Sequence, residues 1–168
     1  PYSVKLRVQW IRDLGSAMAP FNAFLSMMGA ETLHVRMDRH CSNALALAKY
    51  LQNHPKVGWV NYPGLPESKE YQMARKYLKG CSGVLCFGVK GGAAAGERVM
   101  NSLKVAAIAV HVADLRTCVL HPASMTHRQL SEAEQIAAGV SPDLIRVSVG
   151  LEHIDDLIAD FDQALANA

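Results

Sequence analysis

The chain has 168 residues, half of them hydrophobic and 19% charged, which is ordinary for one globular domain. Its 17 basic and 15 acidic residues leave a net charge of +2, so charge gives no case for binding nucleic acid or a membrane surface. The apolar runs stop short of the roughly 20 residues that a membrane span needs, and no signal peptide is visible. We therefore expect a cytoplasmic protein.

Pro20-Phe21-Asn22 opens the longest helical pattern, in which apolar residues recur at steps of three and four from Phe24 to His54. Pro55 ends it. A helix of about 30 residues would be about 45 Å long, more than a compact domain of this size needs. We therefore expect the N-terminal half of this helix to pack on something outside the chain, either a partner subunit or a missing domain.

Shorter elements alternate beyond Pro55. The strand pattern predicts strands within residues 56–66, 83–92, 106–110, 116–122 and 144–150, and helical spacing predicts helices within 68–78, 93–103, 131–139 and from Ile154 onward. Ser131 can cap the third of these helices, with Glu134 completing a capping box. The order predicts an α+β fold, with helices layered on a small and mostly antiparallel sheet.

The segment "LIRVSVG", residues 144–150, reads as a strand with an arginine at its centre. Alternation places Ile145, Val147 and Val149 on one face, and Arg146 on the other with its neighbours two positions away. Arg146 either lies on a face of the sheet that meets water or lines a pocket and holds an anion. The pattern alone favours the first reading, since exposed arginines are common.

Other candidate sites give weaker signals. "VKGGAAAG" follows a strand but fits no phosphate-loop spacing. The seven histidines show no metal-ligand spacing, and no serine sits in a G-x-S-x-G elbow, so we expect no metal site and no serine nucleophile. Cys41, Cys81, Cys86 and Cys118 form no C-x-x-C pair, which favours buried free thiols. The polar segment "HPASMTHRQL" is either a plain loop or a binding loop.

Four segments, taken together and in order, resemble a known enzyme family. They are "RDLGSAMAPFNAFLSMMGAETLHVRMDRHCSNALALAKYL", "HPKVGWVNYPGLP", "HPASMTHRQLS" and "LIRVSVGLEHIDDLIADFDQAL". They resemble the C-terminal part of the Cys/Met-metabolism enzymes that depend on pyridoxal phosphate, and within that family they are most similar to O-acetylhomoserine sulfhydrylases. The resemblance covers nearly the whole chain.

This resemblance implies that residues 1–168 form the C-terminal small domain of a fold-type I enzyme, with 1–54 as a linking helix region and 55–168 as the α+β core. Pyridoxal phosphate would be bound mainly by a missing large domain, which would also carry the Schiff-base lysine. None of the lysines here lies in an S-x-x-K context. We therefore expect no catalytic or cofactor-binding residue in this chain, and no activity from it alone.

The resemblance also implies two substrate-binding residues. In the family, the arginine of the "LIR-SVGLE" strand grips the α-carboxylate of the amino-acid substrate, and that role falls on Arg146. A small polar residue before "HPAS" assists at the same carboxylate, and its position is occupied by His111 here. Val112 and Ala113 replace a pattern that often contains glycine.

The implied reaction is γ-replacement in methionine biosynthesis, in which O-acetyl-L-homoserine and sulfide or a thiol give homocysteine or methionine and acetate. The implied partners are that substrate, sulfide and the large domain, and the implied assembly is a homo-oligomer, usually a homotetramer. Cystathionine γ-synthase, cystathionine γ-lyase and methionine γ-lyase activities are alternatives in the same family. A stand-alone amino-acid-binding or oligomerisation module is an alternative of another class.

Overall fold

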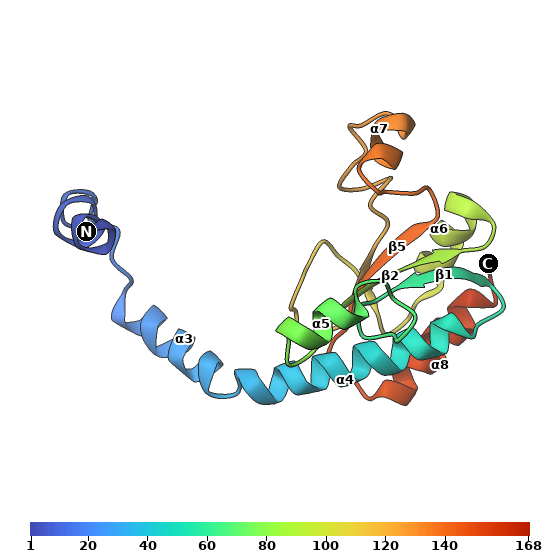
Figure 1. Cartoon of the computed structure of the whole chain (residues 1–168), viewed down its shortest axis with the longest axis horizontal. Helices are drawn as coiled ribbons and strands as arrows, with labels where there is room; N and C mark the ends of the chain where they lie inside the picture. The colour runs from blue at the N-terminus through green and yellow to red at the C-terminus, as the bar shows by residue number, and fades with distance from the viewer. The chain divides into compact units, whose positions relative to one another are not determined.

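The computed structural model describes all 168 residues and divides them into two units, Pro1–Val35 and Arg36–Ala168. The first unit is helical (Figure 1). It contains α1 (Tyr2–Lys5), the π-helical turn η1 (Leu6–Ile11), α2 (Arg12–Leu14) and α3 (Pro20–Glu31). Gly15 ends α2 in the left-handed conformation, with φ of 69°, and Pro20 begins α3 at a position that tolerates proline. The helices before Pro20 were not predicted from the sequence.

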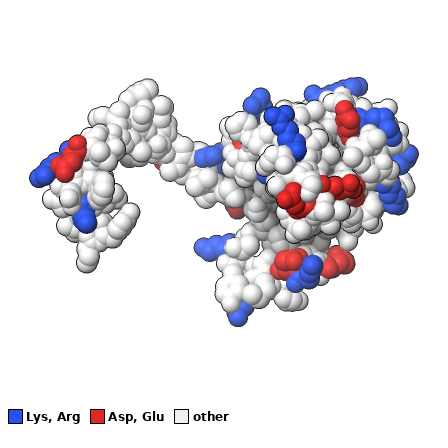
Figure 2. Space-filling model, turned by 90° about the horizontal axis from the view of Figure 1, so that it is seen from above, with Lys and Arg blue, Asp and Glu red and all other residues white.

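The first unit exposes most of its large apolar side chains. Trp10 is 53% exposed and Phe21 is 67% exposed, and α3 buries none of its residues. Figure 2 shows few charged side chains on this unit, whereas acidic and basic side chains are interspersed on the second. No helix of the chain combines the length and the apolar character needed to cross a membrane. An exposed apolar surface of this kind is typical of a surface that packs on another part of a protein.

The expected helix from Phe24 to His54 is interrupted at Thr32. Helix α3 ends at Glu31, Thr32 has φ of −102° and ψ of 5°, and α4 (Leu33–Gln52) begins after it. Threonine is a poor helix former, and α3 buries no side chain that would keep the two helices continuous. The apolar spacing of the sequence is retained on both sides of the break, which is why the pattern reads as one helix.

The second unit is built on one five-stranded sheet. Its strands are β1 (Val57–Asn61), β2 (Val84–Val89), β3 (Ala107–Ile108), β4 (Cys118–Leu120) and β5 (Leu144–Ser148), in the spatial order β1-β2-β5-β4-β3. All neighbours are antiparallel except β3 and β4, which are parallel. The helices that accompany the sheet are α4, α5 (Tyr71–Tyr77), α6 (Gly92–Ser102), α7 (Glu132–Ala137) and α8 (Ile154–Leu165). The α+β prediction is confirmed.

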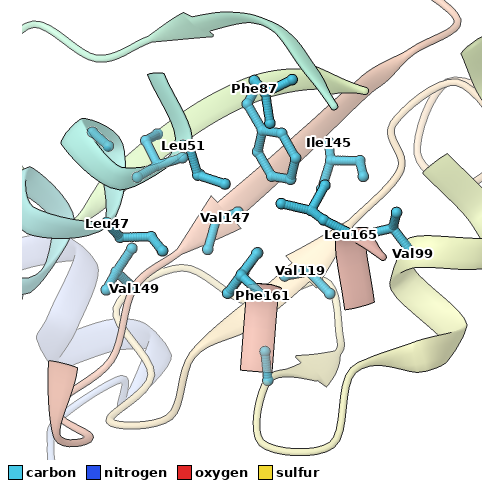
Figure 3. Packing of buried hydrophobic residues seen from close by; sticks show 14 of the residues in the cluster. Leu47, Leu51, Phe87, Val99, Val119, Ile145, Val147, Val149, Phe161 and Leu165 are labelled. Atoms are coloured by element: carbon cyan, nitrogen blue, oxygen red, sulfur yellow. The ribbon is translucent and has the colours of Figure 1, made fainter. Parts of the chain in front are cut away.

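One face of the sheet forms the hydrophobic core (Figure 3). Ile145, Val147 and Val149 of the β5 segment are at most 1% exposed, as their alternation in the sequence predicts. Phe87 of β2 meets Phe161 of α8 edge to face, with ring centroids 6.1 Å apart. Helices α4, α6 and α8 complete the core with residues that include Leu47, Leu51, Val99, Leu157 and Leu165. This packing fixes which side of β5 faces away from the core.

A hydrogen-bonded cluster fixes the chain just after β5. The Glu152 carboxylate accepts from the backbone N–H of Thr117 at 2.6 Å and from its hydroxyl at 2.9 Å. The N–H of Gly150 donates to the Thr117 hydroxyl at 2.8 Å, and the Asn43 amide of α4 donates to the Gly150 carbonyl at 3.0 Å. A Cβ at Gly150 would lie 2.5 Å from the carbonyl oxygen of Leu115. Glycine is therefore required where this turn meets the chain before β4.

The connection from β3 to β4 is attached to β5 through Ser148. The N–H of Ala113 donates to the Ser148 hydroxyl at 3.2 Å. Ala113 has φ of 64°, in the left-handed region that favours glycine. This conformation places an energetic cost in the loop that carries His111.

The close approach at Gly150 predicts that Gly150→Ala destabilises the fold. We expect the free energy of unfolding to fall by about 1–3 kcal/mol, because the backbone atoms in the way cannot move cheaply. This exceeds the roughly 0.4–1 kcal/mol that alanine gains from a less flexible unfolded chain. Urea unfolding measures the effect. Gly29→Ala in α3, where an added Cβ meets nothing within 4 Å, is the control and should not destabilise; equal losses in both would contradict the prediction.

The positive φ at Ala113 predicts that Ala113→Gly stabilises the chain. Relief of a left-handed alanine is worth about 1–2 kcal/mol, and the added freedom of the unfolded chain returns about 0.4–1 kcal/mol, so a gain of roughly 0.5 kcal/mol is expected. The same change at Ala159, which is exposed in α8, should instead cost about 1 kcal/mol. Matched urea titrations compare the two variants. Equal destabilisation would mean that the loop at Ala113 carries no strain.

Candidate functional site

Arg146 lies at the centre of β5, on the face of the sheet opposite the core. Strand β5 is itself the central strand, and Arg146 is paired across the ladders with Cys86 of β2 on one side and Leu120 of β4 on the other. The Arg146 side chain is half-buried, and its Nε atom is buried without a hydrogen-bond partner. The structure pairs this guanidinium with no carboxylate.

An unpaired guanidinium in this setting is chemically informative. A buried N–H donor without a partner destabilises the fold, because it has lost its hydrogen bond to water. That loss is compensated only when an acceptor binds to the donor. Guanidinium offers a planar fork of donors that fits a carboxylate bidentately, and the pairing is strongest where water is partly excluded. The site around Arg146 is therefore suited to bind an anion that comes from outside the chain.

The residues beside Arg146 are neutral. The register gives a row across the sheet of Asn61, Cys86, Arg146 and Leu120, taken from β1 to β4. None of the other three carries a charge in its ordinary state at neutral pH. Burial raises the pKa of the Cys86 thiol, and the nearby Arg146 guanidinium opposes that rise without cancelling it. The row, which we call the Arg146 row, thus holds one positive charge and no internal counter-ion.

A cavity of about 570 Å³ opens next to the Arg146 row. Its walls include Trp59, Asn61, Cys86 and Leu144, whereas Arg146 itself is not part of its lining. The Trp59 indole donates to the Asp143 carboxylate at 2.8 Å, and this bond passes over Gly88. A Cβ at Gly88 would overlap both groups, so glycine is needed under the bond. The cavity gives small molecules access to the side of Cys86.

His111 is the second residue that the resemblance singled out. It is exposed on the β3–β4 connection, and it forms no hydrogen bond or ion pair with Arg146. Its charge is felt by the nearby Asp114, whose pKa is lowered mainly by its hydrogen bonds from Arg116 and to a lesser degree by His111. The structure therefore attaches the loop of His111 to β5 through Ala113 and Ser148, and it shows no hydrogen bond between the His111 ring and the guanidinium.

The polar segment "HPASMTHRQL" uses its polar groups within its own loop. His121 contacts the Pro142 carbonyl oxygen through Nε2 at 2.7 Å and the Ser124 hydroxyl through Nδ1 at 2.8 Å. The Gln135 amide of α7 donates to the carbonyl oxygens of Ala123 and His127, at 3.0 and 2.9 Å. These bonds hold the chain between β4 and β5 in place, and so they help to position the start of β5, the strand that carries Arg146.

The neighbours of Arg146 were not predicted from the sequence. Alternation in "GVLCFGV" places Cys86 on the opposite face from Leu85 and Phe87, but only the strand register shows that it lies beside Arg146. The register likewise adds Asn61 to the same row. All four cysteines are free, as expected, although only Cys118 is fully buried.

Comparison with known proteins places the chain in a family. The family model for Cys/Met metabolism PLP-dependent enzymes matches residues 2–166. The chain is 54% identical to a homocysteine synthase of Schizosaccharomyces pombe and 50% identical to O-acetyl-L-homoserine sulfhydrylase 1 of Thermus thermophilus. Each match covers 98% of this chain, but only 38% of the first relative and 39% of the second.

A solved structure gives the same result. A protein of Campylobacter jejuni assigned as an O-acetylhomoserine (thiol)-lyase, which contains N'-pyridoxyl-lysine-5'-monophosphate, superposes with a TM-score of 0.89 at 40% identity. The superposition covers 98% of this chain and 39% of that one. The chain thus spans about two fifths of the length of the relatives it matches. On these grounds it belongs to the Cys/Met-metabolism family of pyridoxal-phosphate-dependent enzymes.

Proposed function

We propose that this chain is the C-terminal, substrate-carboxylate-binding domain of an O-acetylhomoserine sulfhydrylase. The observation that carries the proposal is the Arg146 guanidinium, half-buried at the centre of the sheet, with a buried Nε that has no partner. The α-carboxylate of an amino acid supplies the acceptor that this group lacks. The names of the similar relatives support O-acetyl-L-homoserine as that amino acid.

The Arg146 row fits the carboxylate of a substrate better than the phosphate of the cofactor. It contains one cation, and Asn61, Cys86 and Leu120 add no second positive charge for a phosphate dianion. We therefore assign the cofactor phosphate, and the lysine that carries the cofactor, to the part of the enzyme outside these 168 residues. When bound, the cofactor supplies an electron sink for removal of the α and β protons of the substrate.

In the proposed reaction, sulfide or a thiol replaces the acetate of O-acetyl-L-homoserine, giving homocysteine or methionine. The part played by this chain is positioning. Arg146 holds the α-carboxylate at two points, which fixes the direction of the amino group and of the side chain that loses acetate. The apolar core behind β5 keeps Arg146 on a rigid strand, so the hold is precise. His111 is proposed as a second and weaker contact, made when its loop approaches the substrate.

The partners of this chain are proposed from its exposed apolar surface. The first unit leaves Trp10, Phe21 and Phe24 more than half exposed, within a unit of 35 residues that buries no large apolar side chain. We propose that this surface packs on the large domain of the same enzyme and on a second subunit of a homo-oligomer. Exposing so many apolar side chains to water is unfavourable, and packing them against another protein surface would remove this free-energy cost.

Substitution of Arg146 tests the proposed role in the enzyme that contains this chain. Arg146→Met should lower kcat/KM for O-acetyl-L-homoserine about 100-fold or more, since losing one partner of a desolvated charge pair costs about 2–5 kcal/mol. Arg146→Lys keeps the charge but loses the fork, and a loss of about 10-fold is expected. Steady-state kinetics measures both. Arg98→Lys in α6 is the control, and an unchanged kcat/KM in the Arg146 variants would refute the assignment.

Borohydride trapping tests the division of labour between this chain and the rest of the enzyme. The 168-residue chain, mixed with pyridoxal phosphate and reduced, should yield no single modified lysine on peptide mapping, because none lies in an S-x-x-K context. It should also turn over no O-acetyl-L-homoserine. If one of its lysines is trapped stoichiometrically, the cofactor belongs to this chain and the proposal is wrong. Tight binding of homoserine derivatives by the chain alone would instead favour an independent binding module.

A further inference from the structure

The thiol of Cys86 is a reactive group that lies directly opposite the unpaired Arg146 in the ladder between β2 and β5. Cys86 and Arg146 are Cα partners in the antiparallel pairing of β2 with β5, so their side chains emerge on the same face. Directly opposite residues in such a pair have Cβ atoms about 4.5–5.5 Å apart, within reach of a charge-assisted hydrogen bond once the long arginine side chain adjusts. The electrostatic interaction of Arg146 with the thiol is consistent with this proximity.

Cys86 is also the cysteine of the Arg146 face that small reagents can reach. It is half-buried and lines the cavity of about 570 Å³. Cys118 is 1% exposed, which protects it. Cys41 and Cys81 are half-buried as well, but they line a different cavity, of about 440 Å³. Oxidation of these last two would therefore leave the surroundings of Arg146 unchanged, which makes them internal references.

We propose that Cys86 is an oxidation site that controls Arg146: hydroperoxide converts the thiol to a sulfinate, which pairs with the guanidinium and occupies the place of the substrate carboxylate. The proposal rests on the proposed role of Arg146 for its effect on substrate, although the pairing itself depends only on the geometry of β2 and β5. A sulfinate resembles a carboxylate in having two oxygen atoms that share one negative charge, so it fits the same fork.

The chemistry uses two equivalents of hydroperoxide, here hydrogen peroxide. In the first step the Cys86 sulfur attacks one peroxide oxygen, the O–O bond breaks, and the thiol becomes a sulfenic acid with release of one water. In the second step another peroxide oxygen is transferred in the same way, giving sulfinic acid and a second water; its proton is then lost to solvent. Sulfur loses four electrons in total and the two peroxides gain them, so no other reductant or oxidant is needed.

The surroundings of Cys86 disfavour the first oxidation step but favour the sulfinate product. Burial raises the pKa of the thiol and so keeps the reactive thiolate scarce, which makes the first step slow and dependent on excess peroxide. The product is an anion beside an unpaired cation, and ion pairing at a partly buried site favours it over a free sulfinate in water. The site is thus slow to oxidise but held firmly once oxidised, since sulfinic acids are not reduced by ordinary thiols.

The experiment follows the side-chain Nε–H signal of Arg146 in the ¹⁵N-labelled 168-residue chain, assigned by its loss in Arg146→Lys. Excess hydrogen peroxide at mildly alkaline pH should add two oxygen atoms to the Cys86 peptide, as read by mass spectrometry, and shift the Arg146 signal in parallel. Cys86→Ser, which has nearly the same size and cannot form a sulfinate, should keep the signal in place under the same treatment. Cys86→Asp should shift it without peroxide.

Two results would overturn the proposal. One is oxidation of Cys41 and Cys81 while Cys86 stays reduced, and the other is a Cys86 sulfinate that leaves the Arg146 signal unmoved. The experiment contains no substrate, so its outcome is separate from the kinetic test of Arg146. A shifted signal together with unchanged kinetics in the Arg146 variants would retain the cysteine–arginine pair and reject the carboxylate role. An unmoved Arg146 signal together with impaired kinetics in the Arg146 variants would reject the cysteine–arginine pair and retain the carboxylate role.

Discussion

The packing of β5 is the constraint from which the rest of the site follows. Successive side chains of a strand point to opposite faces, so burying Ile145 and Val147 in the core with α4, α6 and α8 forces Arg146 to the other side. Because β5 lies in the middle of the sheet, Arg146 cannot reach a free edge and is flanked on both sides by strands. A shift in register by one residue would place the guanidinium in the core and the valine in the site.

The magnitudes explain why the fold can carry an unpaired guanidinium. Full burial of a valine or isoleucine side chain is worth about 1.5–3 kcal/mol, and the β5 segment contributes three such residues, Ile145, Val147 and Val149. An unsatisfied buried donor costs about 1–3 kcal/mol, so the Nε atom of Arg146 offsets only part of the stabilisation from burying these three side chains. The folded domain can therefore tolerate this donor without an acceptor of its own, and the proposed carboxylate would supply one.

Much of this arrangement could be predicted from the sequence, because the informative patterns are local. Period-two alternation gave the two faces of β5, and Ser131 with Glu134 gave the capping box that begins α7. The break at Thr32 was not predictable, because apolar spacing continues through it and one threonine, although a weak helix former, does not by itself end a helix. The neighbours of Arg146 were not predictable either: Cys86 and Asn61 join it only through strand register, which depends on turns and packing far along the chain.

The bond between Trp59 and Asp143 has a spectroscopic consequence. The chain has two tryptophans, and they are divided between its units: Trp10 in η1 of the first and Trp59 in β1 of the second. Trp10 is 53% exposed, whereas Trp59 is half-buried, with its indole N–H held by a carboxylate beside the cavity next to the Arg146 row. Intrinsic fluorescence of the unmodified chain therefore contains two separable probes, one that reports on the surroundings of the N-terminal helices and one that reports on the cavity next to the Arg146 row.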